Sequence, residues 1–283
     1  MIMKNILFLL FCCSLSAFAQ DDLLDEIDQN ATVTPVLATF KGLKIVNFES
    51  TKMVAQNQLA FVVSHRFGSI KNGFDTFFGL DDAVTDIKFI YGLTDGFQLS
   101  ASRSSYGKIY DLSAKFGLLQ QQTEGMPVTV VGFSSFLVNS GLEEENLPGL
   151  EFKHRLGYTM QVLIARKFTE NFSAEVAPTV FHDNFIANPE QENTQYAIGI
   201  GGRYKITKRF SLNADYGIHL NRAENSPFSN PLSIGVDIET GGHVFQLLFS
   251  NAQPMMTNKF LSEATGDWTD GDIFFGFNLS RFF

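Results

Sequence analysis

The 283-residue sequence is poor in cysteine, and its two cysteines, Cys12 and Cys13, both lie close to the start. Here Lys4, a short apolar run and a small-residue pattern ending at Ala19 follow one another in the order of a secretory signal peptide. Cleavage after Ala19 would remove both thiols. The rest of the chain would then have neither a disulfide nor a cysteine-bound metal.

Long apolar runs are also lacking, because none outside the start reaches the roughly eighteen residues of a membrane-spanning helix. A helical membrane protein is therefore excluded. Tryptophan is scarce too: one residue against 30 phenylalanines, which recur beside the expected turns. The net charge of −9 and the 45% hydrophobic residues would suit a soluble enzyme equally well. The phenylalanine distribution instead is typical of aromatic girdles at two membrane interfaces.

What the sequence does contain is strict alternation over residues 156–180. One face carries Leu156, Tyr158, Met160, Val162 and Ile164, and after a short turn Phe172, Ala174, Val176, Pro178 and Val180. A period of two is that of a β-strand, whose successive side chains point to opposite faces. Each run exceeds the roughly five to six residues of a soluble strand and matches the roughly nine to eleven that cross a bilayer. The stretch predicts a transmembrane hairpin.

Three places share one turn plan, an apolar residue, Thr, two polar or glycine residues and then Phe: residues 93–97, 168–172 and 206–210. The plan predicts the opposite pairs Tyr91 with Leu99, Ile164 with Val176, and Tyr204 with Leu212. Hairpins with three-residue loops usually place a left-handed residue last in the loop. Gly96 and Asn171 suit that position, and Arg209 suits it poorly.

The pattern predicts twelve strands, at 57–67, 83–93, 97–105, 108–118, 127–139, 152–168, 172–182, 194–206, 210–220, 231–240, 243–251 and 272–283. Tight turns and long polar loops alternate between them, although 119–126 is long for a tight turn and 106–107 is short for a loop. An even count with this alternation is typical of an all-β, antiparallel outer-membrane barrel. We expect a signal peptide at 1–19, an acidic, partly disordered or capping segment at 20–56, and the barrel at 57–283.

Two stretches outside the barrel core leave alternatives open. The acidic run Asp21–Asp28 favours a solvated tail over a helical turn. Residues 39–48 fit a short strand, a periplasmic cap or a piece of chain lying in the lumen. At the other end, the alternation up to Phe283 resembles the signal that hands barrels to the outer-membrane assembly machinery, although Arg281 departs from it. The expected partners are therefore that machinery, outer-membrane lipid and a small solute, with no nucleic acid.

Motifs for catalysis and metal binding are weak. Asp237, Glu239 and His243 have the composition of a metal cluster, but a two-residue turn at 241–242 pairs Thr240 with His243 and points His243 away from the two carboxylates. No metal and no cofactor are expected. The histidines lie near strand ends, and no spacing suggests a nucleophile–histidine–carboxylate triad. An outer-membrane hydrolase is the minor alternative to a non-enzyme.

The face expected to line the lumen carries charges of both signs, and these are the candidate site residues: Arg66, Lys88, Asp111, Lys115, Arg155, Glu175, Arg203, Asp215, Asp237 and Glu239. They suit either a field across a wet channel or a salt-bridge network in a closed barrel. Small residues share this face: Gly157, Ala177, Ala197, Gly199, Gly201, Gly217 and Gly235. They leave room for water, a solute or the N-terminal segment, or they ease strand curvature.

From about residue 39 to its end, the chain resembles an uncharacterised outer-membrane β-barrel family of Bacteroidota, a domain of unknown function. The segments that carry the resemblance are 64–68, 78–81, 163–168, 201–216 and 230–245. The resemblance implies a bacterial outer-membrane location and a barrel fold, and it supplies no catalytic residues. We therefore expect a narrow channel or transport protein for a small polar solute. The alternative is a non-conducting barrel that has a structural role or binds a partner.

Overall fold

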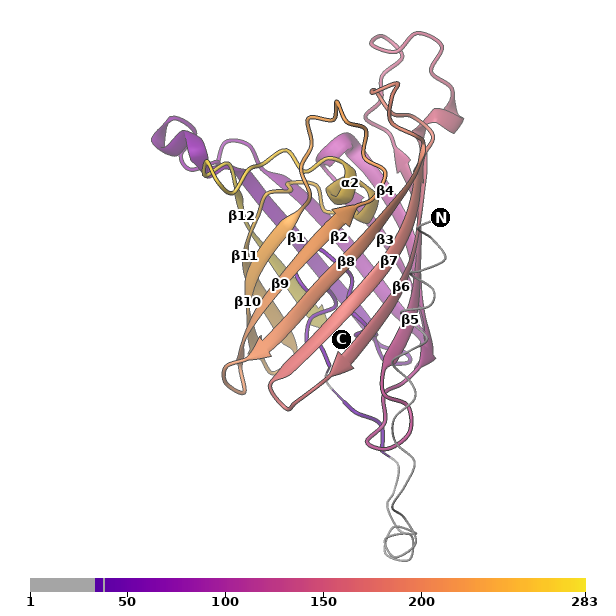
Figure 1. Ribbon diagram of the computed structural model, residues 1–283, viewed down its shortest axis with the longest axis vertical. Coiled ribbons are helices and arrows are strands. Elements are labelled where there is room, and N and C mark those ends of the chain that lie inside the picture. Colours follow the sequence, from indigo (N-terminus) through magenta and orange to yellow (C-terminus); the bar gives the residue numbers. More distant parts are fainter. Residues whose placement is uncertain (1–33, 38) are drawn as a thin grey trace, which may run out of the picture. The chain divides into compact units, whose positions relative to one another are not determined.

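A computed structural model describes residues 34–37 and 39–283 of the chain, so the expected signal peptide and the run Asp21–Asp28 lie outside the described residues. Twelve antiparallel strands form one closed barrel in chain order, with β1 pairing with β12 to complete the ring (Figure 1). No helix among the described residues is long and apolar enough to cross a membrane. The expected all-β barrel is confirmed.

The strands are β1 (Leu59–Ser69), β2 (Val84–Thr94), β3 (Phe97–Ser104), β4 (Ile109–Leu119), β5 (Thr129–Asn139), β6 (Leu156–Lys167), β7 (Phe172–Asp183), β8 (Thr194–Lys205), β9 (Phe210–His219), β10 (Leu232–Thr240), β11 (His243–Ser250) and β12 (Phe274–Phe282). The largest boundary difference from the sequence prediction is at β6, which starts at Leu156 instead of residue 152. Residues 152–155 there form a short 3-10 helix, η5 (Phe152–Arg155).

The predicted registers are confirmed: Tyr91 pairs with Leu99, Ile164 with Val176, Tyr204 with Leu212, and Thr240 with His243. The two faces of β6 differ as the alternation requires. Val162 is 41% exposed on the outer face, whereas its neighbour Gln161 is 3% exposed inside. The outer surface is therefore the apolar one.

The expectation of a left-handed residue in the three-residue turns is wrong, because Gly96, Asn171 and Arg209 all have ordinary backbone angles. The repeated threonine stabilises these turns instead. The Thr169 hydroxyl accepts hydrogen bonds from the backbone N–H groups of residues 171 and 172, and Thr207 does the same for residues 209 and 210. Short hydroxyl side chains commonly close turns in this way.

Short turns gather at one end of the barrel and long loops at the other (Figure 1). The long β4–β5 turn has a structural reason: Pro35 pairs with Gln122, and the Val36 N–H donates to the Gln121 carbonyl at 2.8 Å. This turn thus holds the start of the described chain. The short β3–β4 connection, η4 (Tyr106–Lys108), lies at the long-loop end.

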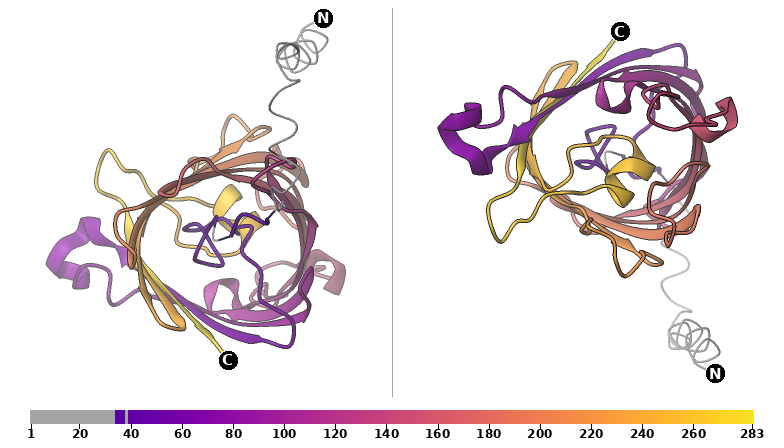
Figure 2. Two further views of the ribbon diagram at one scale, coloured as in Figure 1. Left: turned by 90° about the horizontal axis from the view of Figure 1, so that it is seen from below. Right: turned by 90° about the horizontal axis from the view of Figure 1, so that it is seen from above.

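Two segments lie inside the ring of strands (Figure 2). Residues 39–54, here called the inner plug, precede β1 at the short-turn end. Residues 251–266, the outer plug, belong to the long β11–β12 loop and include the helix α2 (Thr257–Ser262). Of the alternatives for residues 39–48, the structure shows a piece of chain in the lumen.

The outer face gives a depth-dependent prediction for arginine substitutions. Val162→Arg, near the middle of β6, should lower the free energy of unfolding by about 2–4 kcal/mol, because hydrocarbon solvates a guanidinium poorly. Val138→Arg, on the outer face near the long-loop end of β5, should cost about 0–1 kcal/mol. Urea unfolding, followed by the gel shift between boiled and unboiled samples, measures both. Equal losses at the two positions would contradict a membrane centred on the strands.

Candidate functional site

The inner plug folds back on itself. The Ile45 N–H donates to the Phe48 carbonyl at 2.9 Å, and the Ser50 N–H donates to the Leu43 carbonyl at 3.0 Å. The backbones of Lys44 and Glu49 thereby form an isolated antiparallel β-bridge. Leu43, Ile45 and Phe48 are at most 4% exposed. The segment therefore has a defined compact form with apolar side chains, unlike a solvated leader.

The Asp215 side chain of β9 binds the backbone at the tip of the inner plug. Its Oδ2 atom accepts hydrogen bonds from the backbone N–H groups of Val46, Asn47 and Phe48 at 2.9, 2.7 and 3.0 Å. Buried backbone donors cost free energy unless they find an acceptor. One wall carboxylate thus supplies what a strand or helix would otherwise provide.

Glu49 forms the centre of a buried charge cluster. Its carboxylate lies 2.9 Å from the Lys115 ammonium, 3.5 Å from Lys88 and 4.0 Å from Lys44. Burial alone would raise the pKa of Glu49, but the three lysines hold it well below its usual range. Lys115 also donates to the backbone carbonyls of Leu43 and Ser50. The inner plug is therefore anchored by charge as well as by shape.

Polar wall residues complete the anchoring. The Arg66 guanidinium donates to Asn47 Oδ1 at 2.9 Å, and the Asn47 amide donates to the hydroxyls of Ser233 and Ser250. Glu175 accepts from the Thr51 N–H at 3.0 Å. Arg66, Asn47 and Glu175 are each at most 2% exposed. These hydrogen bonds add to apolar packing of the same segment on the wall, such as that of Ile45 near Leu248 and Leu43 near Val62.

Three wall glycines make the space that the plugs fill. A Cβ at Gly199 would lie 2.2 Å from the Phe48 ring, and one at Gly201 would lie 2.5 Å from Ile45 Cδ1. A Cβ at Gly217 would lie 2.7 Å from Leu261 of the outer plug. Larger side chains on this part of β8 and β9 would exclude the plugs, so these small residues serve docking.

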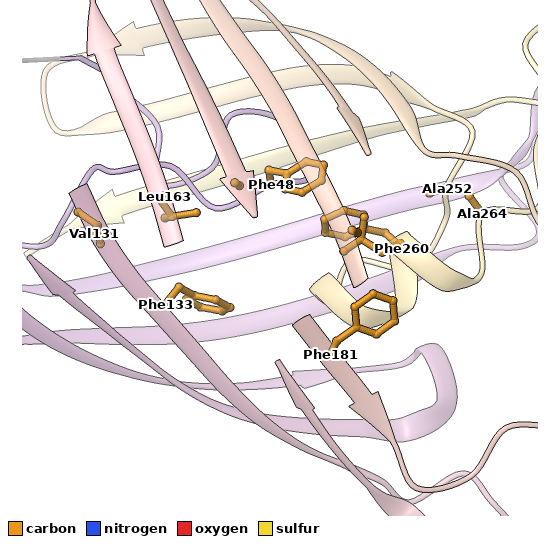
Figure 3. Packing of buried hydrophobic residues seen from close by; sticks show 11 residues of the cluster. Phe48, Val131, Phe133, Leu163, Phe181, Ala252, Phe260 and Ala264 are labelled. Carbon is orange, nitrogen blue, oxygen red and sulfur yellow. The ribbon is translucent and has the colours of Figure 1, made fainter. Parts of the chain in front are cut away.

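The two plugs meet at an apolar cluster in the interior. The Phe48 and Phe260 rings pack edge to face with centroids 4.9 Å apart (Figure 3). Around them lie further buried apolar side chains: Val131, Phe133, Leu163, Ala177, Phe181, Ala197, Ala252, Leu261 and Ala264. The Lys44 ammonium also donates to the Met255 carbonyl at 3.0 Å. The plugs therefore contact each other as well as the wall.

The outer plug has an ionic anchor of its own. The Lys259 ammonium lies 3.4 Å from Asp183 and 2.8 Å from Glu263. Asn258 donates to the other Asp183 oxygen, and the Tyr106 hydroxyl donates to the other Glu263 oxygen. Burial opposes the charge on Lys259, yet the two carboxylates hold its pKa above the usual range. The short η4 connection thus reaches α2.

The predicted lumen residues fall into three groups. Arg66, Lys88, Lys115, Glu175 and Asp215 contact the inner plug, and Glu239 pairs with its Lys41 at 2.8 Å. Asp111, Arg203 and Asp237 are buried but bond to the wall, as in the contact of Arg203 with Ser211. Arg155 lies in η5, outside the strands, and donates to the carbonyls of Asn139 and Leu142.

Several important residues were not among the sequence candidates: Asn47, Phe48, Glu49, Asp183, Lys259 and Phe260. The first three lie in or directly after residues 39–48, for which the sequence allows three alternatives. Asp183 ends β7, and the other two lie in a loop expected to be polar. The available signal was the apolar content of residues 40–54 beside a wall face rich in glycine. No group of His, Cys, Asp or Glu side chains among the described residues could hold a metal ion.

A cavity lies on each side of the plug cluster. The inner one, about 480 Å³, is lined by the inner plug and by residues near the β2–β3 and β4–β5 turns. The outer one, about 500 Å³, is lined by α2 and the loops at the long-loop end. The two share no lining residue. The arrangement is that of two vestibules separated by the plugs.

A family described as a membrane-bound beta barrel domain (DUF5777) matches residues 40–283. No curated protein matches the chain. Among solved structures, the KdgM porin in complex with disordered oligogalacturonate has a TM-score of 0.51 at 7% identity, covering 78% of this chain and 98% of KdgM. The NanC porin has a TM-score of 0.46 at 8% identity, covering 78% and 97%. Omp33 of Acinetobacter baumannii has a TM-score of 0.42 at 8% identity, covering 82% and 100%.

Gly199→Ala should loosen the inner plug, because the new Cβ would overlap the Phe48 ring. Overpacking of this kind costs about 1–3 kcal/mol, which predicts trypsin cleavage at Lys44 at least about fivefold faster. Gly202→Ala on the same strand is the control, since its Cβ would meet its nearest neighbour at an ordinary 3.4 Å. Unchanged cleavage of the Gly199→Ala barrel would contradict the docking.

Lys44 gives a pH prediction. Burial lowers its pKa to about 8, although Glu49 opposes this shift. Between pH 8 and the ordinary value of 10.5 the unfolded chain binds more protons, so the free energy of unfolding should rise with pH. From pH 8 to 10 the wild type should gain about 2 kcal/mol relative to Lys44→Met, as measured by urea unfolding. Lys208→Met, on an exposed turn, should track the wild type, and parallel curves for all three proteins would disprove the shift.

Proposed function

The chain belongs to the DUF5777 family of membrane-bound β-barrel domains and lies in the bacterial outer membrane, and we propose that it is a gated channel for small polar solutes. In the closed state the inner plug blocks the passage, packed against the outer plug. Opening requires the inner plug to leave the wall of β8 and β9. The observation that carries the proposal is the set of buried charged wall side chains that contact this plug beside its apolar packing.

A plug that never leaves the lumen would be stabilised at least as well by apolar side chains. Buried ion pairs are often no more stabilising than well-packed hydrophobic residues of the same volume, because desolvating the charges is costly. Yet Lys88, Lys115 and Asp215 of the wall meet Glu49 and backbone groups of the plug. When the plug moves away, these wall groups can form hydrogen bonds with water instead. A polar wall therefore suits both the closed and the open state.

The inner plug is attached in a way that suits movement. It belongs to no strand of the barrel, and it precedes β1 at the short-turn end. Its first clamp is the pairing of Pro35 and Val36 with the β4–β5 turn. The plug can therefore undock while all twelve strands keep their hydrogen bonds. Charges of both signs on the exposed wall would then favour small polar solutes over apolar ones.

The fold itself is compatible with solute passage, since KdgM, which has the same fold, is a porin. A fold alone does not assign a function, so the plug and its polar contacts carry the argument. As further partners we propose the lipid around the apolar outer face and the barrel assembly machinery, the latter because apolar and polar residues alternate along the last strand, β12.

The alternative function, a permanently closed barrel that binds a partner, is favoured by one observation. The Phe48–Phe260 contact lies in an extended apolar cluster, which is typical of a fixed core. The two functions differ in whether the inner plug ever leaves the wall, and a reversible cross-link separates them.

The pair Ile45→Cys and Gly201→Cys is suited to such a cross-link. Ile45 Cγ2 lies 3.3 Å from the position of a Cβ at Gly201, which is close enough for a disulfide, and the small cysteine at position 45 compensates for the added side chain. In planar bilayers the reduced barrel should show conductance steps. The oxidised barrel should show none, because the inner plug is held on β8.

Two controls complete the experiment. The single variant Ile45→Cys should conduct alike under both redox conditions, and a barrel lacking residues 34–54 should conduct continuously. Silence of the reduced double variant and the wild type, with conductance only after deletion of the segment, would support the permanently closed barrel. Equal conductance of the oxidised and reduced forms would show that the inner plug does not gate the passage.

A further inference from the structure

The outer cavity has the features of a ligand site. Its volume of about 500 Å³ lies within the range of about 300–1,000 Å³ that small-molecule sites occupy. Phe185 and Phe228 supply aromatic surface, and Asn188, Gln191 and Asn225 supply amides. A predominantly apolar pocket with a few placed polar groups is the usual form of such a site.

The walls of this cavity are held in place before any ligand binds. The Asn188 amide in the β7–β8 loop donates to Asn225 Oδ1 in the β9–β10 loop at 2.6 Å. Gln191 accepts from the Ala223 N–H at 2.8 Å and donates to the Asn221 carbonyl at 3.0 Å. The two loops therefore form one connected wall, which reduces the ordering cost of binding.

The charges in the cavity exclude a charged ligand. Asp183 and Glu263 give two negative charges against the one positive charge of Lys259, so an anion would be repelled. A cation would have to compete with Lys259 for both carboxylates, because each of their four oxygens already accepts a hydrogen bond. Asn258 and Lys259 use those of Asp183, and Lys259 and Tyr106 use those of Glu263.

What the cavity does offer is an unused acceptor. Gln195 of β8 lines it and is 1% exposed, and its Oε1 atom has no hydrogen-bond partner among the described residues. A buried acceptor without a donor costs free energy, and a ligand hydroxyl would satisfy it. Neutral hydroxyl groups combined with an apolar surface for Phe185 and Phe228 are the chemistry of a sugar.

We propose that the outer cavity binds a neutral mono- or disaccharide, with a hydroxyl donating to Gln195 and the apolar sugar face against Phe185 or Phe228. The site rests against the outer plug, since Lys259, Ser262 and Glu263 all line it. The next residues of α2, Phe260 and Leu261, pack into the cluster around Phe48. This assignment rests on the proposed function, in that it names the solute that would reach the closed gate.

Calorimetric titration of the folded wild-type barrel in detergent tests the site, with glucose, galactose, maltose and lactose as probes and glucuronate as the anionic comparison. At least one neutral sugar should bind, and glucuronate should bind at least about tenfold more weakly than that sugar. Gln195→Leu should weaken binding about tenfold, the usual effect of losing one buried hydrogen bond. It should leave the unfolding midpoint unchanged or higher, because the unsatisfied acceptor is removed.

The matched pair for the aromatic contact is Phe228→Ala and Phe152→Ala, the latter on the exposed η5 helix and not among the residues that line the cavity. Only Phe228→Ala should bind the neutral sugar more weakly than the wild type. The proposal is overturned if none of the four sugars binds, if glucuronate binds best, or if Gln195→Leu and Phe228→Ala both bind like the wild type. Because calorimetry needs no conduction, sugar binding to a silent barrel would retain the site and reject the gated channel.

Discussion

The closed state depends on one interaction, the acceptance of three consecutive backbone N–H groups by the Asp215 carboxylate. Non-strand chain inside a barrel leaves backbone donors that water cannot easily reach, and each costs free energy until an acceptor is supplied. Asp215 supplies one acceptor for Val46, Asn47 and Phe48 together. This fixes the tip of the inner plug and directs the Phe48 ring towards Phe260 of the outer plug. Packing of the interior follows from that position.

The wall and the plugs match each other in shape and in charge. Gly199 and Gly201 leave the volume that Phe48 and Ile45 fill, and Lys115 meets the carboxylate of Glu49. Each wall feature has another use once the plug is away, since glycines widen a passage and charged side chains hydrate it. The same residues can therefore close the lumen tightly and line it when open. An apolar wall would achieve only the first.

The strands and their registers could be predicted from the sequence because each obeys a local rule. The alternation around Val162 and the two-residue turn before His243 each decide which face a residue occupies, whatever lies inside the barrel. Contents of the lumen follow no such rule. Glu49 meets Lys115 across 66 positions of sequence and Phe48 meets Phe260 across 212, and neither contact has a periodic signature. The glycine-rich face showed that space existed there, but the occupant lay in a segment without strand periodicity. Strand ends are predicted less accurately than strand faces. At Arg155, the helix η5 replaces the expected first residues of β6.

The central claim is that the inner plug is docked yet can leave while the barrel stays intact, and amide hydrogen exchange of Val46, Asn47 and Phe48 in the native protein tests it most directly. Docked donors that undock locally exchange more slowly than loop amides but faster than the strand amides of β8 and β9, with an opening free energy below that of global unfolding. The account predicts this intermediate rate, shared by all three amides. Exchange at the rate of an exposed loop would show that the inner plug is not docked. Exchange only through global unfolding would show that it never leaves and would contradict a gate.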